Sequence, residues 1–225
     1  MPDKTPEEWR REFLLQMYGQ LWNNINRHLT VVWQSVSVLG GAIAVFALVE
    51  KNVLSVDFAT AAVVLLCSWV VTNAYEASGW FNRNQAIITN IEREFLTEED
   101  LAKIHPYFAK HRDPKSMQGH IRIQLVLAAV VAISVTVRHF VIQLWPGIGG
   151  PWSTIQLHKA LPYIMFVVGL IWISAVRNKV ISDQNFFLQK SGKPMQLKVA
   201  STAPPPPLTV SGLVPPTGAN KPQGP

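Results

Sequence analysis

The chain carries few charged residues: Asp, Glu, Lys and Arg make up 15% of its 225 residues, whereas an ordinary soluble domain has about a quarter. Acidic residues are scarce, and none lies between Asp113 and Asp183. The apolar segments in that stretch therefore lack the carboxylate that a proton-coupled carrier normally uses. The only cysteine is Cys67, so an internal disulfide and a cysteine metal cluster are excluded.

Hydrophobic residues make up 48% of the chain and gather in four segments. A helix of about 20 apolar residues crosses the hydrocarbon layer of a bilayer. We therefore expect an all-α integral membrane protein, with Arg138 and His139 extending from the third span toward the interface. Core helices of a large soluble protein are the alternative, but four such segments in one small chain argue against it. The predicted spans are residues 29–49, 56–74, 123–143 and 160–176.

Lysine and arginine are distributed unevenly between the two sides of these spans. Residues 1–28, 75–122 and 177–225 hold 4, 7 and 6 of them, whereas residues 50–57 and 138–159 hold 1 and 2. Basic residues concentrate on the cytoplasmic side of membrane proteins. We therefore expect a multi-pass protein of the cell inner (plasma) membrane with both termini in the cytoplasm. Tryptophans near the span ends are the expected interfacial anchors: Trp22, Trp80, Trp145 and Trp152.

The N-terminal segment, residues 1–28, is predicted to be an amphipathic cytoplasmic helix. Thr5, Pro6 and Glu8 form the pattern of a capped helix start. Apolar residues follow at four-residue intervals. This face can lie on the inner leaflet or pack on other cytoplasmic helices, and the equal numbers of acids and bases favour packing. The residues expected to pack on the cytoplasmic side are Trp9, Phe13, Tyr18, Ile91, Phe95 and Phe108.

The middle loop, residues 75–122, is expected to form a cytoplasmic helical hairpin. An apolar stripe runs out of the second span to Phe95, which predicts that this helix protrudes beyond the membrane. Thr97 and Asp100 predict the cap of a second helix. Asp113 and Pro114 predict the start of the helix that becomes the third span.

Beyond the fourth span, a basic cytoplasmic helix is expected within residues 177–200, ending near Lys190. Residues 201–225 contain eight prolines and are expected to be a disordered tail. This tail is either a solvated terminus or a ligand for an SH3-like or WW-like groove. Residues 177–225, which include this tail, carry most of the chain's net positive charge. Attraction to the anionic inner leaflet explains this charge without nucleic acid. The expected inner-leaflet basic residues are Arg177, Lys179, Lys190 and Lys193.

No residue pattern indicates catalysis, and we expect no catalytic residue, metal or cofactor. The chain has no phosphate-binding loop, nucleophile elbow or dinucleotide fingerprint, and its six histidines lack metal-ligand spacing. We expect them to be surface or helix-end residues. A cluster of His105, His111 and His120 that binds a metal or senses protons is the alternative.

Small and weakly polar residues occur within the predicted spans. Gly40, Gly41 and Ala44 form a small face that allows close helix packing. Ser35 and Asn73 are among the polar residues that either bond across helices or line a narrow water path in an oligomer.

Three strings, NRHLTVVWQS (26–35), WFNRNQAIITNIEREFL (80–96) and IHPYFAKHR (104–112), resemble uncharacterised small bacterial inner-membrane proteins. The order of helices is similar to that of RipA-type and SLATT-type membrane proteins. The resemblance to SLATT-type proteins implies a membrane effector of bacterial defence, although this chain has four predicted spans instead of two.

The sequence thus predicts a non-enzymatic membrane protein that contacts the lipid bilayer and assembles with further copies of itself. Its cytoplasmic face is also a candidate surface for a protein partner. The alternatives are a channel or membrane-permeabilising effector gated by the cytoplasmic region, and a histidine-dependent metal or enzyme site.

Overall fold

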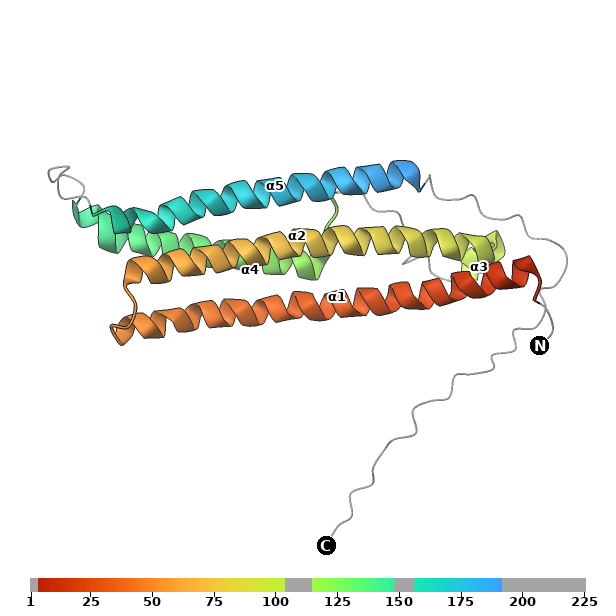
Figure 1. Ribbon diagram of the computed structural model, residues 1–225, viewed down its shortest axis with the longest axis horizontal. Coiled ribbons are helices and arrows are strands. Elements are labelled where there is room, and N and C mark those ends of the chain that lie inside the picture. Colours follow the sequence, from red (N-terminus) through yellow and green to blue (C-terminus); the bar gives the residue numbers. More distant parts are fainter. Residues whose placement is uncertain (1–3, 104–114, 148–155, 192–225) are drawn as a thin grey trace, which may run out of the picture.

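A computed structural model describes residues 4–103, 115–147 and 156–191, and every regular element within these ranges is a helix (Figure 1). Four of the helices are long and apolar enough to cross a membrane. The structure therefore confirms an all-helical protein with four candidate spans. Predictions for residues 1–3, 104–114, 148–155 and 192–225, including the proline-rich tail, lie outside the described residues.

Helix α1 (Pro6–Glu50) runs without a break from the predicted amphipathic segment into the first span. Its N-terminus has the predicted cap: the Glu8 N–H donates to Thr5 Oγ1 at 3.3 Å, and the Thr5 N–H donates to Glu8 Oε2 at 2.7 Å. These bonds also lower the pKa of Glu8. At about 1.5 Å per residue the helix is about 68 Å long, more than twice the hydrocarbon thickness of a bilayer.

Helix α2 (Val56–Phe95) follows after the short connection 51–55 and extends well beyond the predicted span, as its apolar stripe predicts. Ser55 caps it by accepting from the Phe58 N–H at 3.3 Å. The short helix α3 (Glu98–Lys103) starts behind the predicted cap. There the Thr97 N–H donates to Asp100 Oδ2 at 2.9 Å, which lowers the pKa of Asp100.

Helix α4 (Gly119–His139) begins later than the sequence predicts. Residues 115–118 are not helical, so the helix start expected at Asp113 and Pro114 is wrong. The Ser116 carbonyl instead accepts a hydrogen bond from Asn82 Nδ2 of α2 at 2.8 Å. That tertiary bond holds the segment extended, a contact that local capping patterns do not reveal.

Helix α4 continues as a π-helical turn (Phe140–Leu144) and a 3-10 turn (Trp145–Gly147). A second 3-10 turn (Leu157–Ala160) leads into α5 (Leu161–Lys190), which ends where the sequence predicts. Pro162 stands in the first turn of α5, where its missing N–H costs no helical bond.

Helix α2 is the centre of the molecule, and α1, α4 and α5 pack against it (Figure 1). Burial follows this arrangement: 61% of the most apolar window of α2 is buried, against 11% in α4 and in α5. We call the end with the 51–55 connection the hairpin end, and the end with the α1 N-terminus and the α2 C-terminus the extended end.

Small side chains dominate the packing around α2. Eight of the twenty buried hydrophobic residues are alanine. Lipid tails are as apolar as leucine, so helices in a bilayer associate by close packing and interhelical hydrogen bonds. One such bond joins α1 to α2: Asn73 Nδ2 donates to Ser35 Oγ at 2.7 Å. These two polar residues therefore bond across helices.

A second apolar cluster joins α1 and α2 at the extended end. Its buried members are Leu21, Ile25, Ile88 and Ile91. Polar contacts flank the cluster. The Tyr18 hydroxyl donates to Glu92 Oε1 at 3.2 Å, and Arg10 Nη2 lies 3.0 Å from Glu94 Oε2.

Candidate functional site

A buried polar cluster at the hairpin end joins three helices. Asp57 stands in the first turn of α2, where the helix dipole favours a carboxylate. His139 is the last residue of α4. Their side chains are 7% and 0% exposed, and His139 Nε2 lies 2.7 Å from Asp57 Oδ1. The other ring nitrogen, Nδ1, lies 2.9 Å from the Tyr163 hydroxyl of α5.

The geometry fits one neutral tautomer of the histidine. With the proton on Nε2, His139 donates to Asp57, and Nδ1 accepts the hydroxyl proton of Tyr163. His158, which is half exposed, places Nε2 3.5 Å from the second Asp57 oxygen. The four side chains form a chain of groups able to exchange protons. All four side chains lie at one end of the bundle, so this series of groups does not extend along the length of the candidate spans.

The predicted helix-end position of His139 is correct, but its predicted extension toward the interface is wrong. The ring points into the protein because Asp57 and Tyr163 both bond to it. Antiparallel spans place the start of the second and the end of the third at the same membrane face. The alternating direction of the predicted spans was therefore the feature of the sequence that could have indicated a contact between Asp57 and His139. It does not specify which residues of the two ends face each other.

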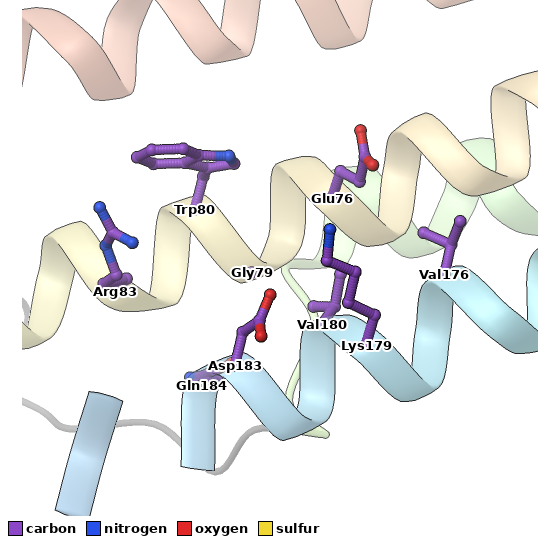
Figure 2. Close-up of a pocket in the computed structure, with 9 residues that line it drawn as sticks. All are labelled: Glu76, Gly79, Trp80, Arg83, Val176, Lys179, Val180, Asp183 and Gln184. Carbon is purple, nitrogen blue, oxygen red and sulfur yellow. The ribbon is translucent and has the colours of Figure 1, made fainter. Parts of the chain in front are cut away.

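A pocket of about 310 Å³ lies between α2 and α5 toward the extended end (Figure 2). The helices approach closely at Gly79: a Cβ added there meets Val180 Cγ1 at 2.6 Å. Figure 2 shows Lys179 and Asp183 extending from α5 toward α2. Glu76 and Arg83 contribute charge from α2. Two acids and two bases make this lining neutral overall.

Aromatic and amide groups complete the pocket wall. The predicted anchor Trp80 contacts the Arg83 guanidinium at 4.4 Å from its ring centroid. Trp80 also stacks on His28 of α1, with ring centroids 5.7 Å apart. Burial, and then the neighbouring Arg27, lower the pKa of His28, which favours the neutral ring. Gln184 is buried in the lining, and its Oε1 accepts no hydrogen bond.

The residues predicted to pack on the cytoplasmic side fall into two groups. Ile91 is buried and Tyr18 packs beside it. Trp9 and Phe13 are 59% and 63% exposed, and Phe95 is also exposed. Phe108 lies outside the described residues.

The predicted anchors and basic residues are spread over several surfaces. Trp22 is half-buried and packs edge-on to Tyr18. Trp145 is exposed near the hairpin end. Arg177 and Lys179 line pockets at the extended end, and the Lys190 ammonium lies 4.6 Å from the Phe186 ring centroid. Trp152 and Lys193 lie outside the described residues.

The small face of α1 points away from the protein. Gly40, Gly41 and Ala44 are exposed, and a Cβ added at either glycine meets no atom within 4 Å. Within the described residues, this small face is therefore not packed against another helix.

The histidine alternative gains no geometric support from the described residues. They contain no group of three His, Cys, Asp or Glu side chains arranged to hold a metal ion. His120 packs edge-on to Phe81, and burial lowers the pKa of His120. His105 and His111 lie outside the described residues.

Comparisons with protein-family models, with curated proteins and with solved structures find no match to this chain.

Proposed function

We propose that this chain is a non-enzymatic protein of the cell inner membrane that assembles into a homo-oligomer through the outward face of α1. The observation that carries the proposal is a stripe of small and polar residues along that face. Spacings of three, four or seven residues keep the stripe on one side of the helix. Its small and polar members are Gly19, Asn23, Asn26, Thr30, Ser37, Gly40 and Ala44, and all of them are exposed. The exposed Trp33 lies on the same side between Thr30 and Ser37 and adds one large side chain to the stripe.

The composition of this stripe suits a helix partner better than lipid. Ser37, Gly40 and Ala44 lie within the predicted span, where a lipid-facing surface normally carries large apolar side chains. Small residues let two backbones approach closely, and hydroxyls gain interhelical bonds. Helix α1 already packs on α2 through its opposite side, with Val32, Ser35 and Leu39 buried. The stripe therefore remains available to a second copy.

Exposed aromatic side chains at the extended end provide independent support. Phe13 lies 16 residues before the first residue of the predicted span, or about 24 Å along the helix. A bilayer whose boundary lies at residue 29 does not reach Phe13 or Trp9. Phe13 lies about a third of a turn away from Gly19 around α1, so a second copy covers both side chains only if the contact is wider than the stripe.

The distribution of basic residues supports the orientation within this proposal. The extended end carries most of the lysines and arginines, so we place it in the cytoplasm.

Cysteine cross-linking in native membranes tests the interface directly. In a Cys67→Ala background, Ser37→Cys is expected to form a disulfide-linked dimer on oxidation, because a two-fold helix pair brings each stripe residue near its own copy. Ile43→Cys is the matched control, since Ile43 is 66% exposed on α1 but lies off the stripe. Equal cross-linking of both variants, or none at Ser37, contradicts the proposal.

Light scattering in mild detergent gives a second measurement. We expect the unmodified chain to be oligomeric and Gly40→Leu to shift it toward monomer, since a Cβ added at this stripe residue meets no atom of the described residues within 4 Å. A strictly monomeric unmodified chain contradicts assembly.

One observation favours a channel as the second candidate function. Gln34 is exposed within the predicted span and lies beside the stripe. In a ring of subunits this amide would face either a neighbour or a water path. Ion flux through liposomes containing the chain distinguishes the two: flux that Gln34→Leu abolishes supports the channel, and the absence of flux supports a purely structural assembly.

A further inference from the structure

A second pocket, of about 260 Å³, also has Val180 in its wall and differs sharply in charge from the first. Among the described residues, its lining contains the bases Lys115, Arg122 and Arg177 and no acid. The pocket of Figure 2 balances Glu76 and Asp183 against two bases. The second pocket is therefore the one that attracts an anion.

The three basic residues come from separate parts of the chain. Lys115 lies in a turn in the non-helical segment before α4, Arg122 in the first turns of α4, and Arg177 in the middle of α5. Within the described residues, neither arginine lies within ion-pair distance of a carboxylate. Both guanidinium groups can therefore bind an external anion without first breaking an internal salt bridge.

The pocket lies at one boundary of the apolar spans. Tyr75 directly follows the second predicted span, Arg122 directly precedes the third, and Arg177 directly follows the fourth. All three line the cavity. In a bilayer this level corresponds to the lipid headgroups, where basic pockets between helices bind phosphate-containing lipids.

The donor set matches a phosphate group. Arginine presents a planar fork of N–H donors that binds two phosphate oxygens at once. Tyr75 adds a hydroxyl to the lining, and it can donate to a further oxygen. The Ser78 hydroxyl already donates to the Ser116 carbonyl at 3.4 Å. The volume is slightly below the range of about 300–1,000 Å³ typical of whole-ligand pockets. It suits a phosphate and its nearest substituents better than a complete lipid.

We propose that Lys115, Arg122 and Arg177 form a binding site for a phosphate group, carried either by the headgroup of an anionic phospholipid or by a soluble phosphate compound. The site does not depend on assembly of the chain.

Calorimetric titration of the full chain in mild detergent tests the site with two probes, short-chain phosphatidylglycerol and inorganic phosphate. The variant Arg122→Gln/Arg177→Gln removes both guanidinium groups. Arg83→Gln/Lys179→Gln is the control, because it removes the same charge from the neighbouring pocket. We expect the first variant to weaken binding at least about tenfold, the loss typical of a charged hydrogen bond, and the control to change it less than about twofold.

The two probes separate the sources of phosphate. Tighter, variant-sensitive binding of phosphatidylglycerol assigns the site to a lipid headgroup, and the reverse order assigns it to a soluble phosphate compound. Absence of binding to both probes, or equal weakening in the two double variants, overturns the proposal. Both arginines are exposed, so the single substitutions Arg122→Gln and Arg177→Gln give the same test should the double variant fail to fold.

Discussion

The two ends of the helix bundle differ in how far they bury ionisable side chains. At the hairpin end, Asp57 and His139 are buried and bond to each other. At the extended end, Arg83, Lys179 and Asp183 surround an open pocket. Removing one member of a buried pair leaves an uncompensated charge, whereas an exposed charge remains solvated. Ionisable side chains therefore join helices at one end and line an open pocket toward the other.

The largest expected effect comes from breaking the hairpin-end pair. His139→Leu leaves Asp57 buried without its main partner, and we expect the free energy of unfolding to fall by about 3 kcal/mol. The measurement is equilibrium unfolding in detergent. Asp57→Asn/His139→Leu removes the charge as well, so the double variant should recover part of the loss. Simple additivity of the two single changes would show that the pair is not coupled.

A smaller effect is expected where α5 crosses α2 between the two ends. A Cβ added at Gly169 collides with the Ser68 side chain, so Gly169→Ala should cost about 1–3 kcal/mol of stability by overpacking. Ser68→Ala removes the hydroxyl and should relieve part of that cost.

Gly119→Ala at the start of α4 is the control for this close contact, because an added Cβ there meets nothing within 4 Å among the described residues and Gly119 lies outside the proposed interface. It should stabilise the helix by about 0.5–1 kcal/mol through its higher helix propensity. Thermal unfolding of Gly169→Ala, of Gly169→Ala/Ser68→Ala and of the control measures these changes in stability. Equal stability changes for the two glycine substitutions would refute the close packing of α5 on α2.

Glu92 makes the extended end sensitive to pH. Burial raises the pKa of Glu92, although the hydrogen bond from Tyr18 opposes the shift. The folded chain therefore holds this proton more tightly than the unfolded chain. Its contribution to stability is complete below the ordinary pKa of 4.5 and is lost as pH rises through the folded pKa.

Glu92→Gln should abolish that part of the pH dependence. The check is the unfolding midpoint between pH 4 and pH 7, with the exposed Glu7→Gln as control. Parallel curves for the unmodified chain and Glu92→Gln would contradict the assignment.

The smallest effect is expected for the ion pair between Arg10 and Glu94. The arginine side chain is 59% exposed, and exposed pairs are typically worth about 0.2–1 kcal/mol. Arg10→Gln should therefore lower stability by less than about 1 kcal/mol, and less still in high salt. A loss of stability as large as that of His139→Leu would show that the exposed pair contributes as much as the buried pair at the hairpin end.

Local features of this fold could be predicted from the sequence, because the causes lie within a few residues. The caps at Thr5 and Thr97 and the end of α5 at Lys190 follow from side chains next to the backbone groups that they affect. The continuation of α2 to Phe95 follows from an uninterrupted apolar stripe.

Features that depend on contacts between helices could not be predicted in the same way. The pairing of Asp57 with His139 joins residues 82 positions apart, and their orientation depends on how α4 rotates against α2. The late start of α4 depends on Asn82 bonding to the Ser116 carbonyl. The pockets beside Val180 depend on the close approach at Gly79, which the sequence records only as one glycine among thirteen.

The central position of α2 has a consequence for biogenesis. Helices α1 and α2 leave the ribosome first and can enter the bilayer as a hairpin, so the docking surface for α4 and α5 exists before either is synthesised. The carboxylate of Asp57 has no histidine partner until His139, 82 residues later in the chain, has been translated. In the proposed orientation the hairpin end lies outside the cytoplasm, so Asp57 crosses the bilayer before His139 is made. Its place beside the short 51–55 connection then keeps it near water on the far side until that histidine arrives.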